Sequence, residues 1–131
     1  ETWARMYPIR SMLDAGVKLV THTDGPAAPV WPWWGMEASL TRKNPTRPDL
    51  EPMGVDQALT VAELIEIYTI NTAYSLHLDE VTGSIEKVKF ADMIVLNHNL
   101  FEVSPTKIHK TEIQRTVIKG EVVYQGRLIA E

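Results

Sequence analysis

The sequence predicts a protein of the α/β class, in which helix and strand patterns alternate before a final group of strands. Three observations lead to this prediction. A helical segment stops at a glycine directly before an apolar run, a later helix opens with a capping box, and the periodicity changes from helix to strand near Asp79. A helix, one glycine and then an apolar strand form the connection expected in α/β proteins.

The first helix and strand lie at the amino-terminal end. Residues 9–15 have the pattern of the end of a helix, and Gly16 stands where a left-handed residue would terminate it. Residues 17–22, Val-Lys-Leu-Val-Thr-His, are rich in β-branched side chains and predict a short strand.

A long connection follows, from Asp24 to Gln57, and it holds six of the eight prolines and three of the four tryptophans. Only residues 35–42 have a helical pattern. Connections of this length are uncommon in compact domains unless they line a site or are disordered. Disordered segments are poor in aromatic residues, so the tryptophans favour an ordered loop.

The clearest helix is predicted over residues 60–76. Thr60 and Glu63 have the spacing of a capping box, with threonine as N-cap and glutamate three residues later. Apolar residues then recur at helical spacing along one side.

Strand patterns occupy the rest of the chain. Residues 83–85 predict a turn and a short strand, and residues 90–96 are so apolar that both faces of the strand should be covered. Residues 113–118 and 121–124 predict a hairpin with Gly120 in its turn. Neither the helical half nor the strand half looks complete, so the sequence predicts an incomplete domain.

Composition restricts the classes of function. The chain has 131 residues and a formal charge of −4, with scattered basic residues, which argues against nucleic-acid binding. No apolar run is long enough to span a bilayer, so no membrane association is expected. Cysteine is absent, which excludes thiolate metal sites and leaves the compartment open, with a cytoplasmic location favoured. The start at Glu1, without methionine, predicts a trimmed chain.

Asp24 is the first candidate for chemistry. It follows the predicted strand 17–22, at the kind of sheet edge where α/β folds place catalytic groups. A carboxylate there can ligate a metal or accept a proton from a metal-bound water. The alternative is an Asx turn with Gly25-Pro26, and spacing alone favours that structural role.

His22 is a second candidate, because strand alternation places it on the same face as Asp24. It would be a ligand or a substrate contact, or else a hydrogen-bonded core residue. His77, His98 and His109 have no metal-ligand spacing and are expected at the surface. A catalytic zinc usually has three protein ligands, so the candidate ligands of this sequence do not complete a site.

Two further residues are candidates for substrate binding. Trp33, with its neighbours Trp31 and Trp34, would form a wall of an apolar pocket or would anchor the long loop to the body of the protein. Arg42 would bind a carboxylate or carbonyl oxygen of a substrate, or would be a solvated arginine at a helix end.

Four stretches, in this order, resemble the amidohydrolase superfamily, and in particular its branch containing the N-substituted formamide deformylases. They are Leu-Asp-Ala-Gly-Val at 13–17 with His-Thr-Asp-Gly-Pro at 22–26, Glu-Ala-Ser-Leu-Thr-Arg at 37–42, residues 59–73, and Gly-Ser-Ile-Glu at 83–86 with Phe-Ala-Asp-Met-Ile-Val-Leu at 90–96. Residues 118–124 also resemble the closing hairpin of that superfamily's small β-sandwich.

The resemblance implies a fold. Residues 1–80 would be the end of a TIM (β/α)8 barrel, with its last strand, a long active-site loop and its last helix. Residues 81–131 would be part of a small β-sandwich. A barrel needs about 250 residues, so most of it, including a His-x-His motif, a bridging lysine or other carboxyl-bearing ligand and two later histidines, would lie in a missing amino-terminal part. That part is the expected partner, together with a possible homo-oligomer.

The resemblance also implies a function: metal-dependent hydrolysis of C–N bonds in small-molecule amides, formamides or cyclic amides. Asp24 would ligate a divalent metal, with zinc favoured, and would move the proton of the attacking water. The metal belongs to the full-length protein, and this chain alone is expected to be inactive and need hold no metal. The alternative is a non-catalytic fragment or degenerate relative that acts as a packing module.

This sequence departs from the superfamily at two places. His22 stands where many relatives have glycine, so its side chain would crowd the site or contribute to it. Lys87-Val88 replaces the usual Pro-Gly. If that turn needs a positive φ, a β-branched valine is poorly suited to it.

Overall fold

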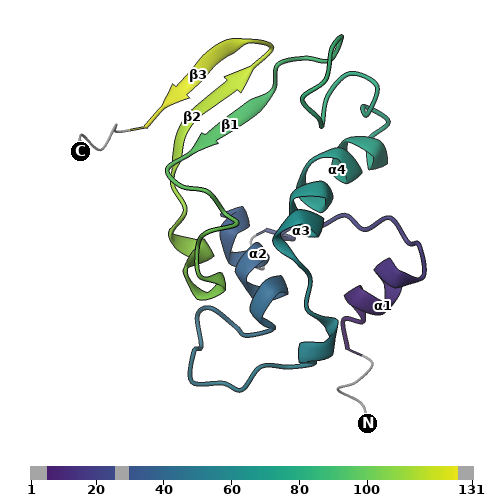
Figure 1. Ribbon diagram of the computed structural model, residues 1–131, viewed down its shortest axis with the longest axis vertical. Helices are drawn as coiled ribbons and strands as arrows, with labels where there is room; N and C mark the ends of the chain where they lie inside the picture. Colours follow the sequence, from purple (N-terminus) through teal and green to yellow (C-terminus); the bar gives the residue numbers. More distant parts are fainter. Residues whose placement is uncertain (1–5, 26–29, 127–131) are drawn as a thin grey trace.

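The computed structural model describes residues 6–25 and 30–126. In this part of the chain, the α-helices come first and a small sheet follows (Figure 1). The α-helices are α1 (Ile9–Asp14), α2 (Pro32–Thr41), α3 (Val61–Tyr68) and α4 (Ile70–Ser75), the 3-10 helices are η2 (Val55–Gln57) and η3 (Pro105–Lys110), and the strands are β1 (Met93–Leu96), β2 (Ile113–Ile118) and β3 (Glu121–Gln125). No helix within these ranges is long and apolar enough to cross a bilayer.

The three strands form an antiparallel sheet in the order β1-β2-β3. The predicted hairpin of β2 and β3 is confirmed. Lys119 and Gly120 connect the strands, and both have a positive φ, of 50° and 84°. A two-residue loop with both residues in the left-handed region matches the right-handed twist of the strands that it joins. The carboxylate of Asp92 supports this turn by accepting a hydrogen bond of 2.7 Å from the Lys119 backbone N–H.

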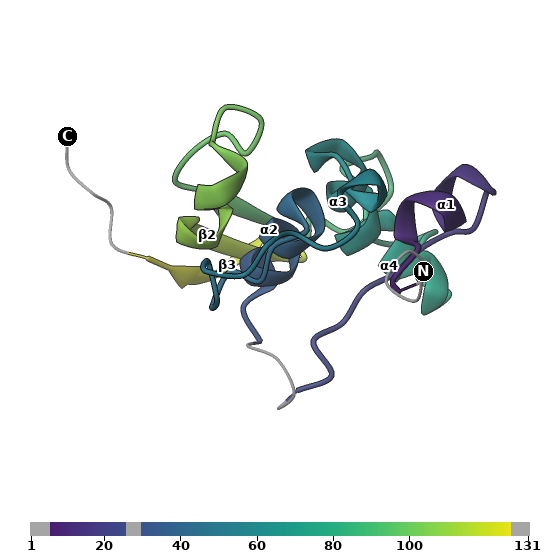
Figure 2. The same cartoon turned by 90° about the horizontal axis from the view of Figure 1, so that it is seen from below.

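Helix α2 lies between the sheet and α3 (Figure 2) and forms the centre of the core. Its residues 33, 36 and 37 are buried, at the spacing that places side chains on one face of a helix. Trp33 and Met36 pack with Leu64 of α3 and Ile108 of η3. The predicted helix over residues 35–42 is therefore present. It begins earlier, at Pro32, where a proline is favoured because the first helical N–H needs no partner.

The capping box at Thr60 is also confirmed, because the Thr60 and Glu63 side chains each accept a hydrogen bond from the other's backbone N–H. The helix predicted over residues 60–76 is interrupted at Thr69, where φ is −120° and ψ is −93°. The hydroxyl groups of Thr69 and Thr72 donate to the carbonyls of Ile65 and Ile67. Hydrogen bonds of this kind compete with regular helical bonding.

Three strand predictions need correction. Residues 17–22 and 83–85 form no strand, and the strand predicted over residues 90–96 is limited to Met93–Leu96. A strand requires a neighbouring strand to pair with its backbone, and no other described residues pair with residues 17–22. Ile94 and Val95 are nearly half exposed, so the expected coverage of both faces is not present in this structure.

An ion pair joins α1 to the start of α3. The Arg10 guanidinium donates to both carboxylate oxygens of Glu63, and Glu63 Oε2 also accepts from the Thr60 backbone N–H at 2.7 Å. These bonds stabilise the ionised carboxylate. The Arg10 guanidinium lowers the pKa of Glu63 from its ordinary value of 4.5 to about 2, and burial partly opposes this effect.

Glu63→Gln should make the stability of the chain less sensitive to acid. The folded pKa of Glu63 lies below the unfolded one, so its contribution is present above pH 4.5 and is lost as the pH falls toward about 2. The free energy of unfolding, measured by urea titration between about pH 6 and pH 2, should fall less steeply in the variant. Glu66→Gln, an exposed change on the same helix, is the control. Equal slopes in wild type and Glu63→Gln would contradict the assignment.

Val88 has a φ of 72° and a fully exposed side chain. The Lys89 backbone N–H donates to the Glu86 carbonyl at 3.3 Å, so Val88 occupies the third position of a four-residue turn. Glycine is preferred at that position when φ is positive. The sequence predicted that valine would suit this turn poorly if the turn needed a positive φ. This is confirmed, because the β-branched Val88 has a left-handed conformation.

Val88→Gly should therefore stabilise the chain by about 0.5–1 kcal/mol, because relief of left-handed strain exceeds the extra chain entropy of glycine. The measurement is the free energy of unfolding from chemical denaturation. Lys87→Gly, in the same turn but without a positive φ, is the matched control and should destabilise. A loss of stability in Val88→Gly would refute the strain argument.

Candidate functional site

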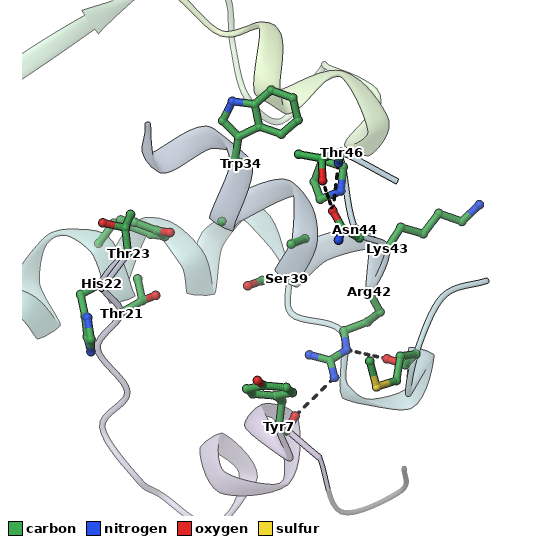
Figure 3. A pocket seen from close by; sticks show the side chains of 15 residues that line it. Tyr7, Thr21, His22, Thr23, Trp34, Ser39, Arg42, Lys43, Asn44 and Thr46 are labelled. Carbon is green, nitrogen blue, oxygen red and sulfur yellow. Dashed lines mark hydrogen bonds between the residues drawn. The ribbon is translucent and has the colours of Figure 1, made fainter. Parts of the chain in front are cut away.

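A cavity of about 500 Å³ lies between α2 and the segment that follows α1 (Figure 3). Its lining comes from five parts of the chain that are distant in sequence: Tyr7, residues 21–23, residues 34–46 in part, Met53 and Tyr68. The volume lies within the range of small-molecule sites. This cavity is the structure's candidate for substrate binding.

One face of α2 supplies the apolar wall of the cavity. Trp34, Gly35, Ala38 and Ser39 line it, on the face adjacent to the one that enters the core. The sequence predicted Trp33 as a substrate contact, but Trp33 is only 3% exposed and belongs to the core. Consecutive helix positions point in directions about 100° apart, so Trp34, which the sequence named together with Trp33, lines the cavity and Trp33 does not.

Trp34 is held in place from the other end of the chain. Its ring stacks on His109 of η3, with centroids 4.9 Å apart. Glu37, whose side chain is 7% exposed, accepts from the His109 backbone N–H at 3.0 Å and lies 2.6 Å from His109 Nδ1. His109 was expected at the surface; its side chain is 25% exposed and is anchored to Glu37.

Arg42 ends α2 in a left-handed conformation, with φ of 56°. Its Nε donates to the carbonyls of Met53 and Gly54, at 3.0 and 3.2 Å, and its Nη2 lies 3.5 Å from the Tyr7 carbonyl. The guanidinium also lines the cavity. Arg42 thus has the structural role of a helix-end arginine and remains a candidate for substrate contact.

Tyr68 closes another side of the cavity. Burial raises the pKa of its phenol, and a hydrogen bond with Thr21 offsets part of that rise. The hydroxyl lies over Gly35 so closely that a Cβ at Gly35 would be 2.5 Å from it. The glycine in the middle of α2 is therefore required by the tyrosine, despite the cost of glycine in a helix.

His22 and Asp24 lie close together, but outside any sheet. The Asp24 backbone N–H donates to His22 Nδ1 at 3.2 Å, and the Asp24 carboxylate lies 3.9 Å from the same nitrogen. Asp24 has a φ of 53°, and its side chain is 83% exposed. His22 lines the cavity, whereas Asp24 does not. His22 is exposed, so the alternative of a core histidine is wrong; Pro26 of the alternative Asx turn lies outside the described residues.

The residues present do not form a metal site by themselves. Within residues 6–25 and 30–126, no three His, Cys, Asp or Glu side chains lie close enough together to hold a metal ion. The His98 side chain forms a hydrogen bond with Thr111, and the His109 side chain forms one with Glu37. Among the described residues, neither histidine is hydrogen-bonded to Asp24. Asp24 and His22 supply at most two donors, fewer than the three protein ligands of a typical catalytic zinc.

Comparison with known proteins identifies the family. The profile described as "Amidohydrolase family" matches residues 1–124. The chain belongs to the amidohydrolase family. Three similar proteins are the N-substituted formamide deformylase of Arthrobacter pascens (31% identical over 121 residues), the putative amidohydrolase YtcJ of Bacillus subtilis (28% over 116 residues) and a probable imidazolonepropionase of Nematostella vectensis (35% over 123 residues).

These matches cover most of this amidohydrolase chain and a small share of each relative. They span 92%, 88% and 92% of this chain, but only 22%, 22% and 26% of the relatives. An amidohydrolase from Thermotoga maritima has a similar structure, with a TM-score of 0.67 and 25% identity, over 92% of this chain and 26% of that one. The chain thus spans about a quarter of the length of the proteins that it resembles.

Gly35→Ala should destabilise the chain by about 1–3 kcal/mol, because the new methyl group would collide with the Tyr68 hydroxyl. In a Tyr68→Phe background the colliding oxygen is gone, and the same change should cost much less, since alanine is the better helix former. Unfolding free energies of the four proteins in this double-mutant cycle give the coupling. An equal cost in both backgrounds would contradict the close approach.

Proposed function

We propose that this chain is part of a metal-dependent amidohydrolase that hydrolyses C–N bonds of small amides, formamides or cyclic amides. Residues 1–80 would contribute the end of a (β/α)8 barrel, and residues 81–131 would contribute part of a β-sandwich. The observation that carries the proposal is the family match over residues 1–124. Similarity to proteins named as a formamide deformylase and an imidazolonepropionase supports the bond type.

Asp24 is the proposed catalytic residue of this chain. Its carboxylate is exposed, and its backbone N–H donates a hydrogen bond to the His22 ring nitrogen Nδ1. The carboxylate would accept a proton from the attacking water and return it to the departing nitrogen. His22, Trp34 and Arg42 line the cavity where the rest of the substrate would lie, with Trp34 in the role first expected of Trp33.

A divalent metal, with zinc favoured, would supply polarisation of the carbonyl group in the complete enzyme. Asp24 would be the one metal ligand from this chain, because no three His, Cys, Asp or Glu side chains of the described residues lie close enough together to hold the ion. The other ligands would come from the rest of the protein.

A second candidate function is a non-catalytic packing module. The chain exposes 9464 Å², whereas a compact monomer of 14.8 kDa exposes about 7,000 Å². Every residue of β3 is exposed, including Val122, Val123 and Tyr124. This surplus surface fits a chain that packs against a larger body. Both candidate functions include such packing, so only a measurement of hydrolytic activity distinguishes them.

The test is Asp24→Asn in the complete polypeptide that carries residues 1–131, assayed for amine release from formamides and for ring opening of cyclic amides. Loss of the proton-transfer group should lower kcat at least about 100-fold. Bound metal, measured by elemental mass spectrometry, should also decrease. Asp49→Asn, an exposed change paired with Arg47, is the control and should leave both quantities unchanged.

Near-normal turnover and metal content in Asp24→Asn would remove the assignment of Asp24. Absence of hydrolysis by the unmodified polypeptide, across amides, formamides and cyclic amides, would favour the packing module instead.

A further inference from the structure

We propose that the cavity beside α2 binds a carboxylate group on the substrate, with Arg42 as its principal partner. The inference rests on the proposed function only in identifying the ligand as the substrate of an amide hydrolase. It narrows the substrate class to amides that carry a carboxylate and an aromatic or other apolar group.

The charge of the cavity lining is the first support. Arg42 and Lys43 both line the cavity, and His22 lies on another part of its wall. None of the described lining residues is aspartate or glutamate. Arg42 brings a guanidinium into a lining without a carboxylate. Figure 3 shows the Lys43 ammonium extending away from Arg42, so Lys43 adds positive potential only at longer range. This distribution of charge favours an anionic ligand.

The orientation of Arg42 is the second support. Its Nε is used by the Met53 and Gly54 carbonyls, which fixes the plane of the guanidinium. Its Nη2 donates to the Tyr7 carbonyl at 3.5 Å, and no hydrogen bond within residues 6–25 and 30–126 involves its Nη1. Figure 3 shows the end of the guanidinium extending toward the open space between Tyr7 and Ser39. A guanidinium held in one plane can recognise the two oxygens of a carboxylate with a small loss of side-chain entropy.

The remaining lining sets the shape of the ligand. The rings of Trp34 and Tyr68 and the side chain of Met53 provide apolar surface, while Thr21 and Ser39 provide hydroxyl groups. Figure 3 shows His22 and Thr23 across the cavity from Arg42. A ligand with its carboxylate at Arg42 would therefore direct its amide end toward the segment that carries Asp24.

The test compares two probes of nearly equal shape, phenylacetate and its neutral analogue phenylacetamide, titrated into the 131-residue chain by ligand-observed NMR. The wild-type chain should bind phenylacetate at least about tenfold more tightly, and added salt should reduce the difference. Arg42→Met should abolish the preference. Arg47→Met, which removes an arginine outside the cavity lining, is the matched control and should retain it.

Arg42 also supports the loop after α2, so Arg42→Met is checked by circular dichroism, and Lys43→Met provides a second variant. Lys43 is exposed and has no hydrogen bond through its side chain within the described residues, so this change should keep the fold and weaken phenylacetate binding about threefold. Equal binding of the two probes, binding of neither, or an unchanged preference in both variants would overturn the proposal.

The outcome is separable from that of the proposed function. Probe binding requires neither metal nor turnover, so the preference for phenylacetate can hold even if Asp24→Asn leaves hydrolysis intact. Conversely, hydrolysis that depends on Asp24 but shows no preference for carboxylate-bearing amides would retain the function and reject the anion site.

Discussion

Burial of α2 between α3 and η3 is the constraint on which the rest of this structure depends. The buried face of this helix combines Trp33 and Met36 with the carboxylate of Glu37. A buried carboxylate is costly unless it is hydrogen-bonded, and both bonds here come from His109, 72 positions away along the chain. The apolar contacts stabilise the packing of α2 against α3 and η3 but do not specify an orientation. The Glu37–His109 hydrogen bonds fix how η3 is oriented on α2.

The same helix builds the cavity with its adjacent face. Because the core fixes the rotation of α2 about its axis, it also fixes where Trp34 and Gly35 stand. The stack of Trp34 on His109 extends this influence from the carboxy-terminal half of the chain to the cavity wall. Arg42 terminates the helix and faces the same cavity. A change in core packing that rotates or shifts α2 would therefore also move the residues of α2 that line the cavity.

Local chemistry was predictable from the sequence, whereas long-range pairing was not. The capping box of Thr60 and Glu63 depends on residues three apart, and the sequence contains all that it needs. A strand at residues 17–22 depends on a neighbour, and local composition cannot supply one. Helical spacing could indicate that α2 has a buried face, but not which tryptophan belongs to it. The hydrogen bonds between Glu37 and His109 could not be predicted, because no local pattern in either segment indicates that the two residues meet in the fold.

The exposed strand β3 has a consequence for mutational tolerance. All five of its side chains face solvent in this chain, so polar replacements at Val122 or Val123 remove little buried surface and should be nearly neutral here. If the strand is covered inside a larger hydrolase, the same replacements would bury polar groups and become costly. The substitution pattern of β3 in a functional selection would thus record whether a neighbour covers it.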